Sequence, residues 1–353
     1  MVKTEFCVPS SDGIHTLQGR VYLPDTKPRG FFHIVHGMTE HIGRYDRFMT
    51  DMAKAGYICF GFDNLGHGYT ADTKELGFIA ERKGYDLLAR DVERFSGAVI
   101  KKYRDEDETL PYYLMGHSMG SFITRFAVSK YVKPQKFIIM GTGGKNPAAG
   151  AGLLIIAFIK LLFGKRHISP LVDKLAFGSY NKRFGGGTEN DPSPWLTNDG
   201  EERKKYYADP FCTFKFTVSA MGDLIRLNKL TNSKKWYKEM PKDLPVLLVS
   251  GEDDPVGDYG KGVLQVAEGL KKCGIDAKCI IYPNARHEIL NDSTYNHFSI
   301  YSTGMNCDFR FFINVLHKSV EGSPAFKVVI LPWDTTHKEF DFLVVCGRSN
   351  RRK

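Results

Sequence analysis

Ser118 stands in the pentapeptide Gly116-His117-Ser118-Met119-Gly120, between the short apolar run 112–115 and an amphipathic stretch at 121–131. A tight turn from a strand into a helix exposes a serine hydroxyl as a nucleophile, and small flanking residues let the strand and the helix approach each other. The start of the following helix offers backbone N–H groups to a developing oxyanion. An ordinary glycine-rich turn is the alternative, and the strand–turn–helix setting favours the nucleophile.

A serine nucleophile needs a base, and the base needs an acid that orients it. In the strand–turn–helix architecture the acid and then the histidine follow the serine along the chain. Among the five histidines after Ser118, His287 comes just past the apolar run 277–283, where a loop over the carboxyl edge of a sheet would begin. We predict that His287 is the base, rather than an ordinary surface histidine of a loop.

Three carboxylates are candidates for the orienting acid. Glu252, Asp253 and Asp254 directly follow the apolar run 244–251, so all three leave the expected end of a strand. Asp254 also precedes Pro255, which restricts its backbone to an extended conformation. The residues alone leave the choice open, and at least two of the three belong to an ordinary solvated acidic loop.

The segment His36-Gly37-Met38-Thr39-Glu40-His41 follows another apolar run and has the composition of a metal site. Its spacing is one residue longer than the H-x-x-E-H metal helix, and no distant third ligand is evident. A glycine turn after a strand near the serine can instead direct a backbone N–H into an oxyanion hole. We predict Met38 and Met119 as the two N–H donors, and we expect no metal ion at this segment.

Apolar runs alternate with stretches of helical period, which predicts βαβ units and a mostly parallel sheet covered on both faces. The interval 142–240 interrupts this alternation with turn-rich sequence and without a clear strand. We therefore predict an α/β fold with an inserted helical cap. The predicted division comprises a core in two parts at 1–141 and 241–300, a cap at 142–240, and an atypical C-terminal extension at 301–353.

The predicted cap also differs from the rest of the chain in charge. Residues 145–235 hold 15 Lys and Arg against 8 Asp and Glu, in a chain whose net charge is +9. Such a surplus predicts contact with an anionic membrane surface, or is simply a solvated face. The apolar stretch 148–163 would form a helix of roughly 24 Å, too short for a bilayer core of ~30 Å. It is either a buried cap helix or a helix that faces a lipid.

The overall composition excludes several classes of protein. A hydrophobic share of 42% excludes a disordered chain. The seven cysteines suggest neither a disulfide framework nor a zinc site, and the first residues lack the apolar segment of a signal peptide. We expect a protein of the reducing cytosol that contacts a membrane peripherally, and we expect no nucleic-acid partner.

Five motifs together resemble a known family. They are HGMTEH (36–41), FDNLGHG (62–68), GHSMG (116–120), GEDDPVG (251–257) and NARHEIL (284–290). Their order and spacing resemble the monoacylglycerol lipase and lysophospholipase branch of the α/β-hydrolases, which is grouped with serine aminopeptidases of the proline iminopeptidase type. The resemblance implies an eight-stranded sheet and no cofactor. It also implies Ser118 as nucleophile, Asp254 as acid and His287 as base, with Met38 and Met119 as oxyanion donors.

The sequence therefore predicts a serine hydrolase that cleaves carboxylic esters of single-chain lipids through an acyl-enzyme. An aminopeptidase is a second reading, although a positively charged cap is unsuited to a substrate ammonium group. A catalytically impaired membrane-surface binding protein is a third. The expected family ends about one helix after the histidine, whereas this chain continues for 66 residues past His287.

Overall fold

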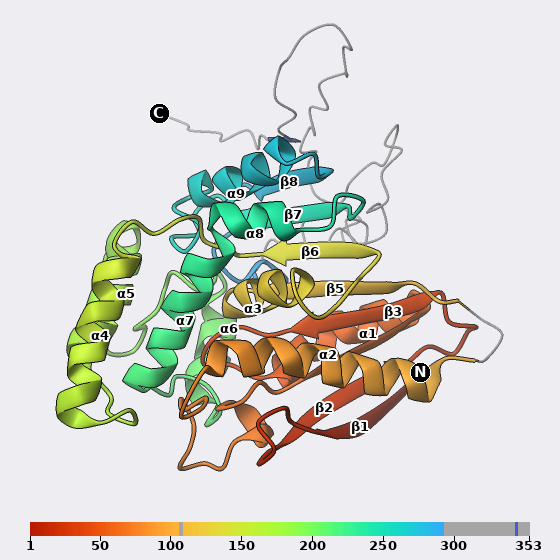
Figure 1. Ribbon diagram of the computed structural model, residues 1–353, viewed down its shortest axis with the longest axis horizontal. Helices are drawn as coiled ribbons and strands as arrows, with labels where there is room; N and C mark the ends of the chain where they lie inside the picture. Colours follow the sequence, from red (N-terminus) through yellow and green to blue (C-terminus); the bar gives the residue numbers. More distant parts are fainter. Residues whose placement is uncertain (106–108, 293–342, 345–353) are drawn as a thin grey trace, which may run out of the picture.

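The computed structural model describes residues 1–105, 109–292 and 343–344 of the chain. The strands in these parts form one sheet, in the order β1-β2-β4-β3-β5-β6-β7-β8-β9 (Figure 1). The second strand pairs antiparallel with both of its neighbours, and the remaining pairs are parallel. The strands are β1 (Val2–Pro9), β2 (Thr16–Leu23), β3 (Gly30–Val35), β4 (Tyr57–Phe62), β5 (Tyr112–His117), β6 (Lys136–Met140), β7 (Val246–Gly251), β8 (Ala277–Tyr282) and β9 (Leu343–Val344).

Helices cover the sheet on both faces because each central strand is apolar on both sides. Leu248 of β7 packs into the cluster on one face, whereas its neighbour Val249 packs into the cluster on the other. The first face carries helices α2, α3 and α9, and the second carries α1. The helices are α1 (Asp46–Lys54), α2 (Gly84–Tyr103), α3 (Met119–Val128), α4 (Ala149–Phe163), α5 (Pro170–Phe177), α6 (Gly200–Ala208), α7 (Val218–Thr231), α8 (Lys234–Glu239) and α9 (Lys261–Lys272).

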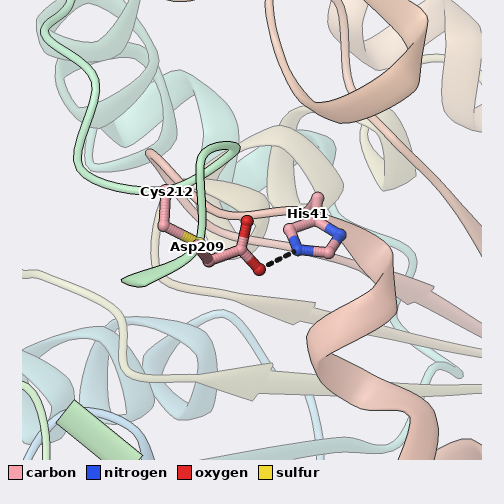
Figure 2. A group of neighbouring side chains, drawn as sticks. All are labelled: His41, Asp209 and Cys212. Atoms are coloured by element: carbon pink, nitrogen blue, oxygen red, sulfur yellow. Dashed lines mark hydrogen bonds and ion pairs between the residues drawn. The ribbon is translucent and has the colours of Figure 1, made fainter. Parts of the chain in front are cut away.

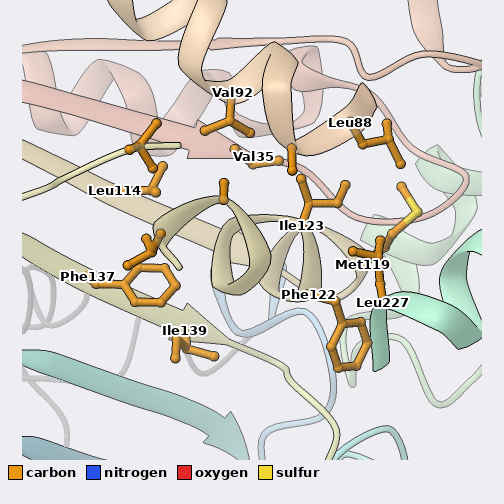
Figure 3. Packing of buried hydrophobic residues seen from close by; sticks show 14 of the residues in the cluster. Val35, Leu88, Val92, Leu114, Met119, Phe122, Ile123, Phe137, Ile139 and Leu227 are labelled. Atoms are coloured by element: carbon orange, nitrogen blue, oxygen red, sulfur yellow. The ribbon is translucent and has the colours of Figure 1, made fainter. Parts of the chain in front are cut away.

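The core around α3 fixes the position of the serine turn (Figure 3). Met119 and Ile123 of this helix pack with Val35 of β3 and Leu88 of α2 in one buried cluster. Leu227 of α7 belongs to the same cluster, so the core extends from the sheet into the segment that follows β6. Burying a side chain of this size stabilises the fold by roughly 1.5–3 kcal/mol, so the packing holds the turn before α3 firmly.

The predicted fold class is confirmed. The sheet has eight strands of five or more residues and is mostly parallel, and the short β9 adds one more pairing at its edge. The antiparallel edge strand β1 was not predicted from the sequence. Its side chains are mostly exposed or partly exposed, so it lacks the apolar run by which the central strands are recognised.

The parallel strands bring four loops to one edge of the sheet. The chain leaves β3, β5, β7 and β8 at their carboxyl ends, and every candidate site residue follows one of these strands within five positions. In open α/β sheets the crevice outside the carboxyl ends of the strands is where ligands bind. The topology therefore places the candidate residues at one edge, although they are up to 249 positions apart in the sequence.

The segment between β6 and β7 contains helices α4 to α8 and, within these fully described residues, no strand. Helices α4 and α5 lie away from the sheet, and α4 packs along α7 (Figure 1). We retain 142–240 as the proposed cap. Helix α4 buries only Ala149, Ile156 and Ile159, so most of its apolar surface is exposed.

Within the described residues we find no helix with the length and apolar character that a membrane span needs. The predicted extension 301–353 lies outside the described residues except for 343–344, and so does the end of the predicted second core segment, 293–300.

Candidate active site

Ser118 lies in a strained turn between β5 and α3. Its backbone angles are φ 53° and ψ −120°, a combination that residues other than glycine rarely adopt. A Cβ atom at Gly120 would lie 2.1 Å from the carbonyl oxygen of Val35, so only glycine lets the helix pass this close to β3. The Ser118 N–H donates to the carbonyl oxygen of Met140, 3.0 Å away. The turn thus has the strand–turn–helix geometry that the pentapeptide predicts.

Asp254 and His287 form a buried hydrogen-bonded pair. The imidazole Nδ1 lies 3.0 Å from the carboxylate Oδ1, and both side chains are almost fully buried. The same carboxylate accepts hydrogen bonds from the Val256 N–H at 2.9 Å and the Ser250 hydroxyl at 3.3 Å. A carboxylate only accepts, so His287 donates through Nδ1 and keeps a lone pair on Nε2. This is the tautomer that a general base requires.

The neighbouring acids have other surroundings. Glu252 is exposed, and its carboxylate accepts a hydrogen bond from the backbone N–H of Asn284 at 3.4 Å. Asp253 is partly exposed, and its N–H donates to the carbonyl oxygen of Ala285. Of the three acids left open by the sequence, Asp254 is the one that meets His287.

The contact between the serine turn and His287 is made by His117, the residue before Ser118. Within the described residues the Ser118 hydroxyl makes no hydrogen bond, so the structure does not join it directly to the imidazole. The ring of His117 instead lies 4.8 Å from the ring of His287, centroid to centroid, and its Nε2 donates to the His287 carbonyl oxygen at 3.2 Å. Serine–base hydrogen bonds are often long or absent without substrate, so this arrangement is compatible with a catalytic pair.

The loop after β3 lies directly against the serine. A Cβ atom at Gly37 would be 3.0 Å from the Cβ atom of Ser118. The backbone N–H groups of Met38 and Met119 have no acceptor among the described residues, and that of Met119 is free because it begins α3. Both predicted oxyanion donors are therefore available, and their assignment stays a prediction.

A buried charged network supports these loops, and the sequence reasoning missed it. Glu40 Oε1 accepts from the Gly37 N–H at 2.6 Å and from the Tyr45 hydroxyl at 2.9 Å. The Tyr45 oxygen in turn lies 2.9 Å from His117 Nδ1, which is also 3.3 Å from Glu40. Arg44 joins Glu40 at 3.0 Å and forms a two-point contact with Glu288 at 2.6 and 2.8 Å. The network thus ties the β3 loop to the loop of the candidate base.

The network shifts the pKa values of its members. Burial alone would lower the pKa of His117, but the hydrogen bond and the charge of Glu40 raise it above its usual value. Burial would likewise raise the pKa of Glu40, but the hydrogen bond from His117 and the charge of Arg44 hold it well below its usual range. Both nitrogens of His117 face acceptors, which fits an imidazolium. A sequence signal for this network was available, because His117 directly precedes Ser118 and Glu288 directly follows His287.

The FDNLGHG loop has a structural role. Asp63 accepts hydrogen bonds from the backbone N–H groups of Ile42 at 2.8 Å and Tyr69 at 2.9 Å. Asn64 donates its N–H to His36 Nε2 at 2.9 Å. The loop therefore helps to hold the β3 loop in place.

Two aromatic residues of the proposed cap, Trp195 and Tyr206, contact the candidate site. The ring of Trp195 lies 5.1 Å from the ring of His287. The Thr39 hydroxyl is hydrogen-bonded to the Tyr206 hydroxyl at 2.9 Å. Cap residues thus contact both the β3 loop and the candidate base.

A further contact between cap and core gathers three possible metal ligands, His41, Asp209 and Cys212 (Figure 2). His41 Nδ1 accepts the N–H of Gly43 at 3.2 Å, so the proton of the neutral ring is on Nε2, which donates to Asp209 at 2.9 Å. A metal ion would need that same Nε2 lone pair. Burial also raises the pKa of the Cys212 thiol, whereas metals bind the thiolate. The cluster therefore fits a hydrogen-bonded contact better than a metal site.

Comparison with known proteins adds to this geometry. The profile of the family described as serine aminopeptidase, S33, matches residues 26–294, which include every candidate site residue. The chain belongs to this S33 family of α/β-hydrolases. The predicted family, with its monoacylglycerol lipase and lysophospholipase branch, is thereby confirmed.

Individual S33 relatives are distant but cover most of the chain. The monoacylglycerol lipase of Mycolicibacterium smegmatis is 26% identical over 278 residues, which cover 77% of this chain and 86% of the relative. The monoglyceride lipase of Homo sapiens is 28% identical over 279 residues, covering 76% and 78%. A solved structure of a thermostable carboxyl esterase from Bacillus coagulans in complex with glycerol has a TM-score of 0.76 and 28% identity, covering 82% and 93%.

Proposed function

We propose that this S33 hydrolase is a serine hydrolase that cleaves carboxylic esters of single-chain lipids, of the monoacylglycerol or lysophospholipid type. The observation that carries the proposal is the buried Asp254–His287 pair beside the strained turn of Ser118. The names of the relatives, monoacylglycerol lipase and monoglyceride lipase, support an ester of this kind.

In the proposed mechanism Ser118 Oγ attacks the ester carbonyl carbon while His287 Nε2 accepts its proton. Asp254 holds the imidazole in the required tautomer and stabilises the imidazolium. The N–H groups of Met38 and Met119 stabilise the oxyanion, each by on the order of 2.7–4 kcal/mol. The imidazolium then protonates the leaving alcohol, and water repeats the cycle on the acyl-enzyme to release the fatty acid.

The outer surface of the cap supports a lipid substrate. We define the cap patch as nine exposed apolar residues of α4, α5 and the link between them. They are Leu154, Ile155, Phe158, Leu161, Leu162, Phe163, Ile168, Leu171 and Leu175. A gathering of exposed large apolar side chains of this kind is typical of an interaction site. We propose that the cap patch rests on a membrane surface and that the enzyme draws its substrate from there.

The structure changes the expected contribution of charge to this contact. Lys165 pairs with Glu81 at 3.0 Å, and Arg166 pairs with Glu75 at 3.1 Å, so these carboxylates offset part of the positive charge beside α4. Lys160 is only partly exposed. Lys174 remains exposed between Leu171 and Leu175. We therefore propose that apolar contact, more than charge, holds the enzyme at a membrane.

We further propose that the enzyme works in the cytosol. All five cysteines within the described residues are free thiols, which is compatible with a reducing compartment.

A fluorophosphonate probe tests the proposed chemistry. The probe should label the wild-type chain and should not label Ser118→Ala. A panel of monoacylglycerols, lysophospholipids, p-nitrophenyl esters and aminoacyl amides then tests the substrate class. Turnover of the amides alone would overturn the ester proposal in favour of an aminopeptidase. Absence of both labelling and turnover would favour a binding protein.

A further inference from the structure

Arg125 of helix α3 is a fully buried arginine that has no carboxylate partner among the described residues. Burial lowers its pKa to about 10, so the guanidinium is charged at neutral pH. Removing a charge from water without an opposite charge is costly, and its Nε–H has no acceptor in the described part of the chain. Because an unpaired buried charge lowers the free energy of unfolding, we expect Arg125 to have a role other than stabilising the fold.

Its hydrogen bonds join two segments that are far apart in the sequence. Nη1 donates to the Thr142 hydroxyl at 3.1 Å and to the Gly143 carbonyl oxygen at 3.3 Å. Nη2 donates to the Thr231 carbonyl oxygen and to the side-chain oxygen of Asn232 at 3.0 Å. Residues 142–143 follow β6, where the chain enters the cap, and residues 231–232 end α7, where it begins to return. One side chain therefore holds both connections between cap and core.

The charge of Arg125 is compensated by the cap itself. Thr231 is the last residue of α7, a helix of 14 residues, and its carbonyl oxygen belongs to the partly negative end of the helix dipole. The guanidinium also lies 4.4 Å from the ring centroid of Trp236, whose Nε1–H donates to the Arg125 carbonyl oxygen at 2.8 Å. These contacts favour a planar, many-donor cation over any shorter or apolar side chain.

The two connections also bind each other. The Asn232 side-chain N–H donates to the Gly144 carbonyl oxygen at 3.2 Å, and Asn228 does the same at 3.0 Å. Thr142, which accepts from Arg125, also accepts from the Ser121 hydroxyl at 2.8 Å. The Ser121 N–H donates in turn to the Ser118 carbonyl oxygen at 2.9 Å. A continuous chain of hydrogen bonds therefore runs from the serine turn to the base of the cap.

We infer that Arg125 is a positioning residue that sets the orientation of the cap over Ser118 and thereby the fit of long acyl chains. It lies on α3, the helix that follows the turn of Ser118, but touches none of the candidate catalytic atoms. The inference rests on the proposed function, because it concerns how lipid esters are held. It implies that a change at Arg125 alters KM for long substrates while leaving the chemistry of short ones in place.

Arg125→Lys tests this inference, because lysine keeps the charge but cannot reach both connections. We expect KM for a long-chain monoacylglycerol to rise by about tenfold, as for the loss of one or two hydrogen bonds. We expect kcat for p-nitrophenyl acetate to stay within about twofold, since the acetate has no long acyl chain for the cap to hold. Arg94→Lys, an exposed position on α2, is the matched control and should change neither value.

Hydrogen–deuterium exchange on the same proteins gives a readout that needs no substrate. Arg125→Lys should speed exchange at 142–144 and 229–233, and Arg94→Lys should not. If Arg125→Lys does not fold, Asn232→Ala decides, because it removes one acceptor of the guanidinium and the two hydrogen bonds from Asn232 to the Gly143 and Gly144 carbonyl oxygens. It should raise KM for the long ester and exchange at the same segments, by a smaller factor.

An equal loss of kcat for short and long esters, with unchanged exchange at the connections, would overturn the inference. Unchanged KM and exchange in the folded variants would overturn it as well. If the wild-type protein cleaves no ester, the proposed function fails, whereas the exchange experiment still reports whether Arg125 holds the cap.

Discussion

The His117 side chain and the His287 backbone are joined by a hydrogen bond of 3.2 Å from Nε2 to the carbonyl oxygen. One residue precedes the candidate nucleophile and the other is the candidate base. A shift of the serine turn is therefore transmitted to the base loop.

We expect Ser118→Ala and His287→Ala each to abolish turnover of p-nitrophenyl esters, and the double variant to be no worse than either single variant. Groups that act as one catalytic unit show this non-additivity. Initial rates on purified proteins measure it, with melting temperature as the control for folding. Wild-type turnover in Ser118→Ala would disprove the site assignment.

Among the three acids, we expect Asp254→Asn to reduce kcat the most, by about 10⁴, because the imidazole loses the acceptor that fixes its tautomer. Glu252→Gln and Asp253→Asn are matched controls on the same loop and should remain near the wild-type rate. Steady-state kinetics distinguishes the variants. Equal modest losses in all three would remove the case for Asp254.

We expect Glu40→Gln to destabilise the fold in a pH-dependent way, by roughly 3 kcal/mol where the pair is charged. The pKa of His117 is raised above 6.5, so its contribution to the free energy of unfolding is full below 6.5 and is lost as pH rises through the folded value. The pKa of Glu40 is lowered below 4.5, so its contribution is present above 4.5 and is lost as pH falls through the folded value.

The melting-temperature difference between wild type and Glu40→Gln should therefore be largest between pH 4.5 and 6.5 and should narrow toward alkaline pH. Differential scanning fluorimetry across this range measures it. Glu93→Gln, an exposed position on α2, is the control and should give a small difference at every pH. A pH-independent difference for Glu40→Gln would show that the charge of His117 does not depend on Glu40.

We expect the double variant Phe158→Ser, Leu161→Ser to lose binding to vesicles of neutral phosphatidylcholine. These side chains are 62% and 81% exposed, and each contributes roughly 1.5–3 kcal/mol when buried in an apolar medium. Co-sedimentation measures the binding, and p-nitrophenyl acetate turnover should be unchanged.

Ile14→Ser, at an 83% exposed position outside the cap, is the control and should bind vesicles normally. Salt should have little effect on wild-type binding, although the Debye length falls from about 10 Å at 0.1 M to about 3 Å at 1 M. A steep loss of binding with salt would show that charge, not the cap patch, dominates.

The sequence predicted the fold because strands such as 246–251 are apolar throughout and helices such as 261–272 keep a clear helical period. It singled out Ser118 and His287 because a strained turn and a strand-end loop need particular residues locally, whereas the residues alone left Asp254 open among three acids and only the family resemblance selected it. It could not decide the exposure of α4, because that helix is apolar on every side and only its packing on α7 determines which face is covered. Nothing local marks Arg125, whose partners are up to 111 residues away.

Trp195 against His287 gives the molecule an optical reporter of its candidate base. In the proposed mechanism the imidazole takes up the serine proton, so a positive charge would arise 5.1 Å from the indole ring, and an imidazolium in contact quenches indole fluorescence. Trp236 lies beside the permanent charge of Arg125, so its emission provides a steady background. Trp333 lies outside the described residues. Stopped-flow emission of the unlabelled protein can therefore follow proton transfer during acylation in real time.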